Sequence, residues 1–293
     1  MTPAVHRGRL ALAAIAAVAV VASSPFVVER VHFVEYGLIA WLFYRAWRPL
    51  DNGLVLAWAL LAGVLTGIAD EFLQWVIPGR VGEAHAVFLD SAAVACGLGV
   101  AIVADPPARF GVTLERSAIR PIAYGVSTVL LVFATFVQVV HLGHQVYEPD
   151  IGVFSSRYTA PELAALSVER AARWRVQPPL ILRRISREDQ YLGEGFWHVQ
   201  ARNLAWSADD PFTAWRENRI LEIFFAPVLD TSSYASLMPP RWPAQQREQT
   251  AARVAGDPGI YISRAAPYPI LTWSPMAFWS AVVVIVAAVM SAC

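Results

Sequence analysis

Residues 54–80 read LVLAWALLAGVLTGIADEFLQWVIPGR, an apolar run that ends in acid. The run is long enough to cross a bilayer as one helix, because a spanning helix needs roughly 17–25 mainly apolar residues. Its last third nevertheless carries Asp70, Glu71 and Gln74, and Arg80 follows a Pro-Gly pair. A charged side chain in hydrocarbon costs on the order of 2.5–3.5 kcal/mol. The stretch therefore predicts a membrane helix with a polar, functional end.

Composition places the whole chain among membrane proteins. Of its 293 residues, 56% are hydrophobic and 16% are charged, whereas a soluble domain has about 45–50% apolar and about 25% charged residues. The net charge is zero, which gives no indication of nucleic-acid binding. Two cysteines, Cys96 and Cys293, cannot form a disulfide framework.

Six segments approach the length and apolarity of a spanning helix, and we predict an α-helical polytopic membrane protein with about six transmembrane helices. These segments are 10–28, 31–47, 54–77, 85–104, 121–140 and 271–290. The first follows Arg7 and Arg9 and also has the composition of a signal peptide, so a retained helix and a cleaved leader both stay open.

Arginine placement predicts the orientation, because cytoplasmic loops carry an excess of basic residues. With the N-terminus inside, the inside stretches hold seven Arg and the short outside loops hold two. The inside set is Arg7, Arg9, Arg45, Arg48, Arg109, Arg116 and Arg120, and the outside set is Arg30 and Arg80. We therefore expect both termini to be cytoplasmic and residues about 145–270 to lie outside.

This orientation predicts three parts: a membrane core at 1–145, an extracytoplasmic α+β domain at 146–270, and a C-terminal transmembrane helix at 271–293. In the outer part, Thr159 and the residues after it form a helix start signal. Two more helical patterns cover 211–225 and 241–254, and strand patterns cover 180–186, 195–202 and 259–265. His198 is expected to be a solvated residue on the second of these strands, where it alternates with Trp197 and Val199.

Polar residues from three predicted spans meet at one level near the outer surface. Intramembrane ionisable groups normally face a bundle interior or a wet cavity, so we take these residues as candidate ligand-binding groups. They are His32, Glu35, Tyr36, Asp70, Glu71, Gln74, Arg80 and Asp90, with His85, His141 and His144 near the same level.

Small residues accompany the polar ones along the helices. Gly63 and Gly67 share a face of the third span and permit close approach of a neighbouring helix. Asp90, Val94 and Gly97 form a matching stripe on the fourth span. The two stripes predict a tight contact that carries the polar groups into the bundle.

Asp70 and Glu71 are consecutive, so their side chains point about 100° apart on a helix. We expect Asp70 to face the second or fourth span and to bond to His32, Tyr36 or their backbone, and Glu71 to face the cavity opposite Arg80.

The charge at this level is unbalanced. Protonation of some carboxyls, charged histidines or a bound cation would each relieve it. A structural alternative, in which single acids only bridge helices by hydrogen bonds, also stays open. The charges are five acids, Glu35, Asp70, Glu71, Glu83 and Asp90, against Arg30 and Arg80.

These residues carry a resemblance. HFVEYG at 32–37, followed by GxxDExxQxxxPGRxG at 67–82 and an acidic fourth helix, resembles the VanZ-like family of bacterial membrane proteins over about residues 8–104. The resemblance implies a core of about four spans in the inner membrane and a link to glycopeptide (teicoplanin) resistance, in a family whose biochemical activity is mostly not established. It supports Glu35, Tyr36, Asp70, Glu71, Gln74, Arg80 and Asp90 as the polar positions. Where the family often has an Asp, this chain has Ala86.

The first functional prediction is a protein that binds an amphiphile at the outer leaflet. A lipid headgroup, a lipid-linked wall precursor or a lipophilic glycopeptide would fit, in a role in resistance or envelope maintenance, and the outer domain would cover the site or recruit a protein partner. This reading assigns no catalytic residue and needs no cofactor. The alternative is a metal-assisted hydrolase of a lipid-linked substrate, with a divalent ion held by the His and acid side chains. A proton-coupled transporter is less favoured, because no polar path continues inward.

Overall fold

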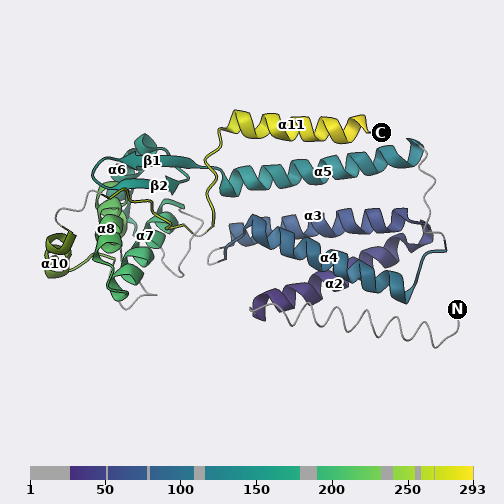
Figure 1. Ribbon diagram of the computed structural model, residues 1–293, viewed down its shortest axis with the longest axis horizontal. Helices are drawn as coiled ribbons and strands as arrows, with labels where there is room; N and C mark the ends of the chain where they lie inside the picture. The colour runs from purple at the N-terminus through teal and green to yellow at the C-terminus, as the bar shows by residue number, and fades with distance from the viewer. Residues whose placement is uncertain are drawn as a thin grey trace. The chain divides into compact units, whose positions relative to one another are not determined.

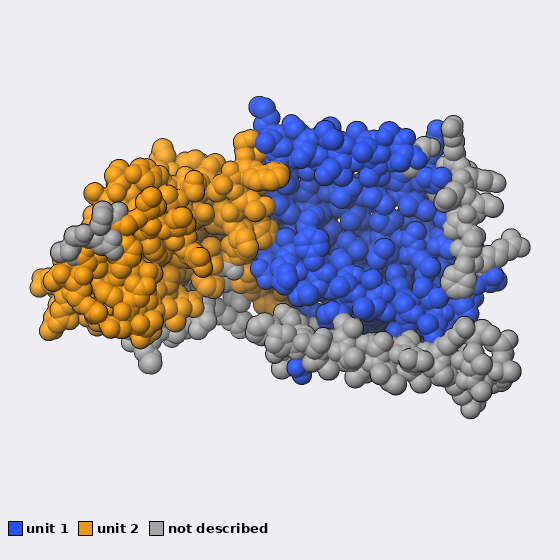
Figure 2. All heavy atoms as spheres, in the orientation of Figure 1, with its two compact units in different colours: residues 1–73, 82–139, 276–293 blue, residues 74–81, 140–275 orange. Residues whose placement is uncertain are grey.

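The computed structural model describes residues 27–50, 52–77, 80–108, 116–178, 190–231, 240–254, 259–266 and 268–292. The chain is mostly helical and divides into two compact units, which Figure 2 colours separately. The first predicted span lies almost wholly outside the described residues, as do the Pro-Gly pair before Arg80 and the predicted strand at 180–186. The first unit comprises residues 1–73, 82–139 and 276–293, and the second comprises 74–81 and 140–275.

The described part of the first unit is built from long helices (Figure 1). Three stretches are long and apolar enough to cross a membrane: Leu54–Val76, Ala84–Ala104 and Ile119–His141. These confirm the third, fourth and fifth predicted spans as apolar helices of spanning length. The helices of this unit are α2 (Val27–Trp47), α3 (Leu54–Val76), α4 (Ala84–Ala104), α5 (Arg116–His141) and α11 (Pro275–Ser291), with a 3-10 turn, η1 (Arg48–Leu50), after α2.

The second and sixth predicted spans correspond to α2 and α11. The α2 helix has 21 residues but carries Arg30, Glu35 and Arg45, so its hydropathy falls below that of the three long apolar helices. The α11 helix is strongly apolar but has 17 residues. Its Trp279 indole donates to Gln138 Oε1 of α5 over 2.6 Å, which joins the two helices within the first unit.

Small residues set the packing of α2, α3 and α4; the stripes predicted the contact of α3 with α4, whereas the contact of Gly97 with α2 was not predicted. A Cβ placed on Gly63 would lie 2.6 Å from Val94 Cγ1, and one placed on Gly67 would lie 3.1 Å from the Cβ of Asp90. A Cβ on Gly97 would lie 2.5 Å from the carbonyl oxygen of Gly37. At Gly97 the α4 helix therefore lies closer to α2 than a residue with a Cβ permits, and at Gly63 and Gly67 a Cβ would require residues of α4 to shift.

Ion pairs hold the far ends of α2 and α4 together. Asp105, directly after α4, accepts from Arg45 Nη1 at 3.0 Å and from Arg48 Nε at 3.2 Å, and its backbone oxygen accepts from the Tyr44 hydroxyl. Exposed ion pairs are worth only about 0–1 kcal/mol. The buried glycine contacts, rather than these pairs, therefore fix the register of the two helices.

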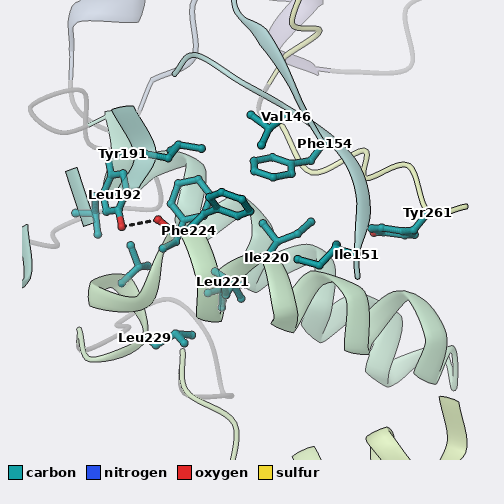
Figure 3. Packing of buried hydrophobic residues seen from close by; sticks show 14 of the residues in the cluster. Val146, Ile151, Phe154, Tyr191, Leu192, Ile220, Leu221, Phe224, Leu229 and Tyr261 are labelled. Carbon is teal, nitrogen blue, oxygen red and sulfur yellow. Dashed lines mark hydrogen bonds between the residues drawn. The ribbon is translucent and has the colours of Figure 1, made fainter. Parts of the chain in front are cut away.

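The described residues of the second unit form one hairpin and several helices (Figure 1). Strands β1 (His144–Glu148) and β2 (Gly152–Ser156) are antiparallel, with Val146 opposite Phe154. Figure 3 shows Phe154 and Phe224 within the buried apolar cluster that forms the core of this unit. The helices are α6 (Ala160–Val176), α7 (Gln190–Ser207), α8 (Pro211–Phe224), α9 (Ala226–Leu229) and α10 (Ala244–Val254).

Two of the helix starts follow from local side-chain chemistry, as predicted. Thr159 accepts from the backbone N–H of Glu162, and the Glu162 carboxylate accepts from the backbone N–H of Thr159, which is a complete capping box at the start of α6. Asp210 accepts from the backbone N–H of Thr213, and Pro211 fills the first helical position of α8.

The predicted strand at 195–202 is wrong, because these residues belong to α7. The buried positions of this helix include Tyr191, Gly195, His198, Arg202 and Ala205, which follow a helical period. The buried face of α7 includes the polar residues His198 and Arg202. In the sequence these residues alternate with apolar ones, and this alternation led to the prediction of a strand. The stretch predicted as a strand at 259–265 contributes an isolated bridge, between Ile262 and Val153.

Candidate functional site

The candidate site is a cluster of buried polar side chains in the first unit, formed by α2, α3 and α4. His32 Nδ1 lies 3.2 Å from Asp90 Oδ1, which joins the start of α2 to the start of α4. Asp90 is 1% exposed. Gly67 of α3 leaves the space beside this carboxylate, because a Cβ on Gly67 would lie 3.5 Å from Asp90 Oδ2.

Tyr36 and Asp70 form the second connection of the cluster. The Tyr36 hydroxyl donates to Asp70 Oδ2 over 3.1 Å, and this confirms the expected contact between Asp70 and the second predicted span. Tyr36 is buried, and its ring lies 6.0 Å from that of His32, one helical turn away. The α2 helix thus presents two polar side chains to two different acids.

Glu71 points into the same cluster from the end of α3. It is 1% exposed, and its Oε2 accepts from the backbone N–H of Glu83, over 3.0 Å. Glu83 is the residue that caps the start of α4. A carboxylate of one helix therefore holds the first backbone donor of the next, a position where negative charge is favourable.

Three potential metal ligands gather here. His32, Glu71 and Asp90 each offer one ligand atom, and these atoms lie within 4.8 Å of one another. Asp90 Oδ2 is also buried without a hydrogen-bond partner among the described residues. A buried carboxylate oxygen with no donor is costly, so this arrangement can accept a proton, a cation or a donor from a ligand.

The remaining predicted site residues lie differently. Glu35 and His85 are exposed. Gln74 and Arg80 belong to the second unit, where Arg80 Nη2 donates to Gln74 Oε1 over 2.8 Å. The guanidinium of Arg80 thus bonds to Gln74, whereas the sequence led us to expect Arg80 opposite Glu71.

The second unit contains a buried polar network that the sequence reasoning missed. His198 is 1% exposed, and its Nδ1 lies 2.6 Å from Glu217 Oε2, so the expectation of a solvated strand residue is wrong. Ser263 donates to Glu217 Oε1 over 2.5 Å, and Tyr261 donates to the same oxygen. The chain segment before α11 is therefore attached to α7 and α8 through one carboxylate.

The ionisation of Glu217 follows from these neighbours. Burial alone raises the pKa of this carboxyl, but His198 and the hydrogen bonds from His198, Ser263 and Tyr261 outweigh burial and lower the pKa below its usual value of 4.5. The ring of His198 also packs edge-on against Phe154 of the apolar core. We interpret this network as structural, because its members are buried together in the core.

Comparison with known proteins identifies the membrane part. Residues 7–105 match the family model described as VanZ/LLP1, a stretch that holds α2, α3 and α4 and all five residues of the cluster. This part of the chain is VanZ-like, which confirms the resemblance seen in its motifs. No curated protein matches the chain. No solved structure matches it either.

Proposed function

We propose that this VanZ-like membrane protein binds an amphiphilic ligand at the outer leaflet of the bacterial inner membrane. The ligand would be a lipid headgroup, a lipid-linked wall precursor or a lipophilic glycopeptide. Such binding would contribute to glycopeptide resistance or to envelope maintenance. We refer to His32, Tyr36, Asp70, Glu71 and Asp90 as the polar cluster.

One observation carries the proposal: the polar cluster is buried between apolar helices. Glu71 and Asp90 are each 1% exposed, and Tyr36 is 3% exposed. Ionisable groups inside membrane helices are costly and usually mark a substrate or ion site. Hydrogen bonds between helices account for part of the cluster, but Asp90 Oδ2 has no such bond among the described residues.

The arginine distribution supports the depth that we assign. The predicted orientation places the ends of α3 and the beginnings of α2 and α4 at the outer side. The polar cluster would then lie below the headgroups of the outer leaflet. In this arrangement an amphiphile could place a polar group against the acids while its acyl chains remain in the bilayer.

The side chains suggest separate roles in binding. Asp70, Glu71 and Asp90 would accept hydrogen bonds from amine, amide or sugar hydroxyl groups of the ligand. Arg80 is exposed, and its guanidinium, which can bind an anion with two parallel hydrogen bonds, would hold a phosphate or carboxylate. The second unit would lie outside the membrane and cover the ligand or recruit a protein partner.

Native mass spectrometry of the full-length protein tests the proposal. Protein extracted in mild detergent should retain a discrete amphiphile, identified by its fragment masses. Glu71→Gln and Arg80→Ala should lose this ligand. Glu148→Gln serves as the matched control, because Glu148 lies in β1, far along the chain from the polar cluster, and this variant should retain the ligand.

The same preparations separate lost binding from lost folding. Each variant should elute as a monodisperse peak and unfold cooperatively before its ligand content is compared. Teicoplanin and an anionic phospholipid, added separately to delipidated protein, show which class rebinds. Equal, nonspecific lipid profiles in the wild type and all variants would contradict the proposal.

A further inference from the structure

The polar cluster has the donors of a metal site as well as those of a hydrogen-bonded site. One imidazole and two carboxylates, from three different helices, bring ligand atoms within 4.8 Å of one another. These residues are His32, Glu71 and Asp90. Donor atoms that share one ion, with bonds of about 2.0–2.6 Å, lie at most about 4–5 Å apart.

A second observation points to a ligand at this place. Asp90 is 1% exposed, and its Oδ2 has no hydrogen-bond partner among the described residues. The other oxygen, Oδ1, is held by His32. A buried carboxylate that is half satisfied can gain its missing interaction from a cation.

We propose that His32, Glu71 and Asp90 bind a divalent transition-metal ion. Imidazole together with carboxylate ligands suits Zn²⁺ or Mn²⁺ better than the harder ions Mg²⁺ and Ca²⁺, which prefer oxygen alone. Three protein ligands leave at least one coordination position for an external group. The inference rests on the proposed function, because the ion would occupy the polar cluster that receives the amphiphile.

The ion would determine which ligand chemistry the cluster accepts. Asp70, Glu71 and Asp90 together repel an anionic headgroup. A divalent ion between Glu71 and Asp90 neutralises these two carboxylates and offers an open position to an oxygen of phosphate or carboxylate. The amphiphile would therefore bind through an anionic group, and Tyr36, whose hydroxyl lies against Asp70, would help to orient the adjoining polar groups.

The direct test measures metal binding by the full-length protein in detergent without added lipid. Protein stripped by a chelator is titrated with Zn²⁺ alone and, in a second series, with Mn²⁺ alone, and bound metal is counted by mass spectrometry. The wild type should bind about one ion per chain. His32→Gln and Asp90→Asn should weaken binding at least about tenfold, whereas Glu148→Gln, in β1, should bind as the wild type does.

A spectroscopic measurement keeps the proposal testable if a variant does not fold. Co²⁺ bound to the wild type should give the visible absorption of a site with nitrogen and oxygen ligands, and Zn²⁺ should displace it. Absence of stoichiometric metal in the wild type, or undiminished binding in folded His32→Gln and Asp90→Asn, would overturn the inference. If the protein binds an amphiphile but no metal, the metal site is contradicted and the proposed function is not. If the protein binds metal but no discrete amphiphile, the proposed function is contradicted and the metal site is not.

Discussion

Gly97 of α4 lies directly against the backbone of Gly37 of α2, where a Cβ on Gly97 would be 2.6 Å from the Cα of Gly37. No side chain fits between the two helices at this point. Gly37 directly follows Tyr36 in the chain. The crossing of α2 and α4 at this point therefore positions His32 and Tyr36, which connect α2 to Asp90 and Asp70.

Gly97→Ala should therefore destabilise the membrane unit. Overpacking of a tight contact costs about 1–3 kcal/mol, and the melting temperature in detergent should fall accordingly. Gly99→Ala is the matched control on the same helix, since a Cβ at Gly99 meets nothing within 4 Å. This control should be neutral or slightly stabilising because alanine favours helix. Equal melting temperatures for the two variants would contradict the close packing of α2 on α4.

A double-mutant cycle should detect the hydrogen bond between Tyr36 and Asp70. Tyr36→Phe removes the donor and Asp70→Ala removes the acceptor, and the pair should show a coupling free energy of about 1–3 kcal/mol, the range for hydrogen bonds to neutral and charged groups. The measurement is thermal or chemical unfolding of the four proteins in one detergent. Tyr124→Phe, at an exposed position on α5, should show no coupling with Asp70→Ala.

The polar end of α3 could be predicted from the sequence because its signal is local. Adjacent acids in an apolar run are conspicuous, and the glycine spacing already indicated which face packs against a neighbour. The connections within the cluster could be predicted only in part. The contact of Asp70 with Tyr36 followed from helical spacing and depth, whereas the bond from Glu71 to the backbone of Glu83 depends on the path of the loop between α3 and α4.

The second unit shows where pattern reasoning fails. Buried His198 and Arg202 occupy core positions of α7 that a hydrophobicity pattern assigns to the surface. They are tolerated there because Glu217 meets the imidazole, while Asn218 and the backbone oxygen of Pro240 accept from the guanidinium. Partners distant in sequence make these residues suitable for a core, and a single sequence does not reveal such partners.

Glu217→Gln should reduce the stability of the second unit in a pH-dependent manner. At neutral pH the amide leaves donors of His198, Tyr261 or Ser263 unsatisfied, at a cost of roughly 1–3 kcal/mol. The folded-state pKa of Glu217 is lowered from 4.5, so the advantage of the wild type is fully present above about pH 4.5 and is lost as the pH falls through the folded-state value.

Melting curves of the full-length wild type and variant between pH 3 and pH 7 check this expectation. The comparison with the variant focuses on Glu217, because Glu194, the other carboxyl that is buried among the described residues of this unit and whose pKa is raised by burial, is common to both proteins. Glu248→Gln, at an exposed position on α10, should follow the wild type throughout. A difference that stays constant down to pH 3 would contradict the ionised state assigned to Glu217.

Reporter fusions test the predicted orientation. Alkaline phosphatase is active only after export, so a fusion after Asp150 should be active and one after Arg109 should be inactive. The reason is the excess of arginine in the stretches assigned to the cytoplasm. The reverse pattern would move the polar cluster to the inner leaflet, and the proposed outer-leaflet ligand would then be excluded.

The shared carboxylate of Glu217 constrains how this protein can diverge. Three side chains from two separate segments converge on its two oxygens: His198 from α7, and Tyr261 and Ser263 from the segment before α11. Substitution of Glu217 leaves all of these donors without their acceptor at once. Substitutions that do not lower stability must therefore change several of these positions together. Homologous sequences should accordingly either keep all four residues or exchange them as a group, and correlated columns in an alignment would record this shared history.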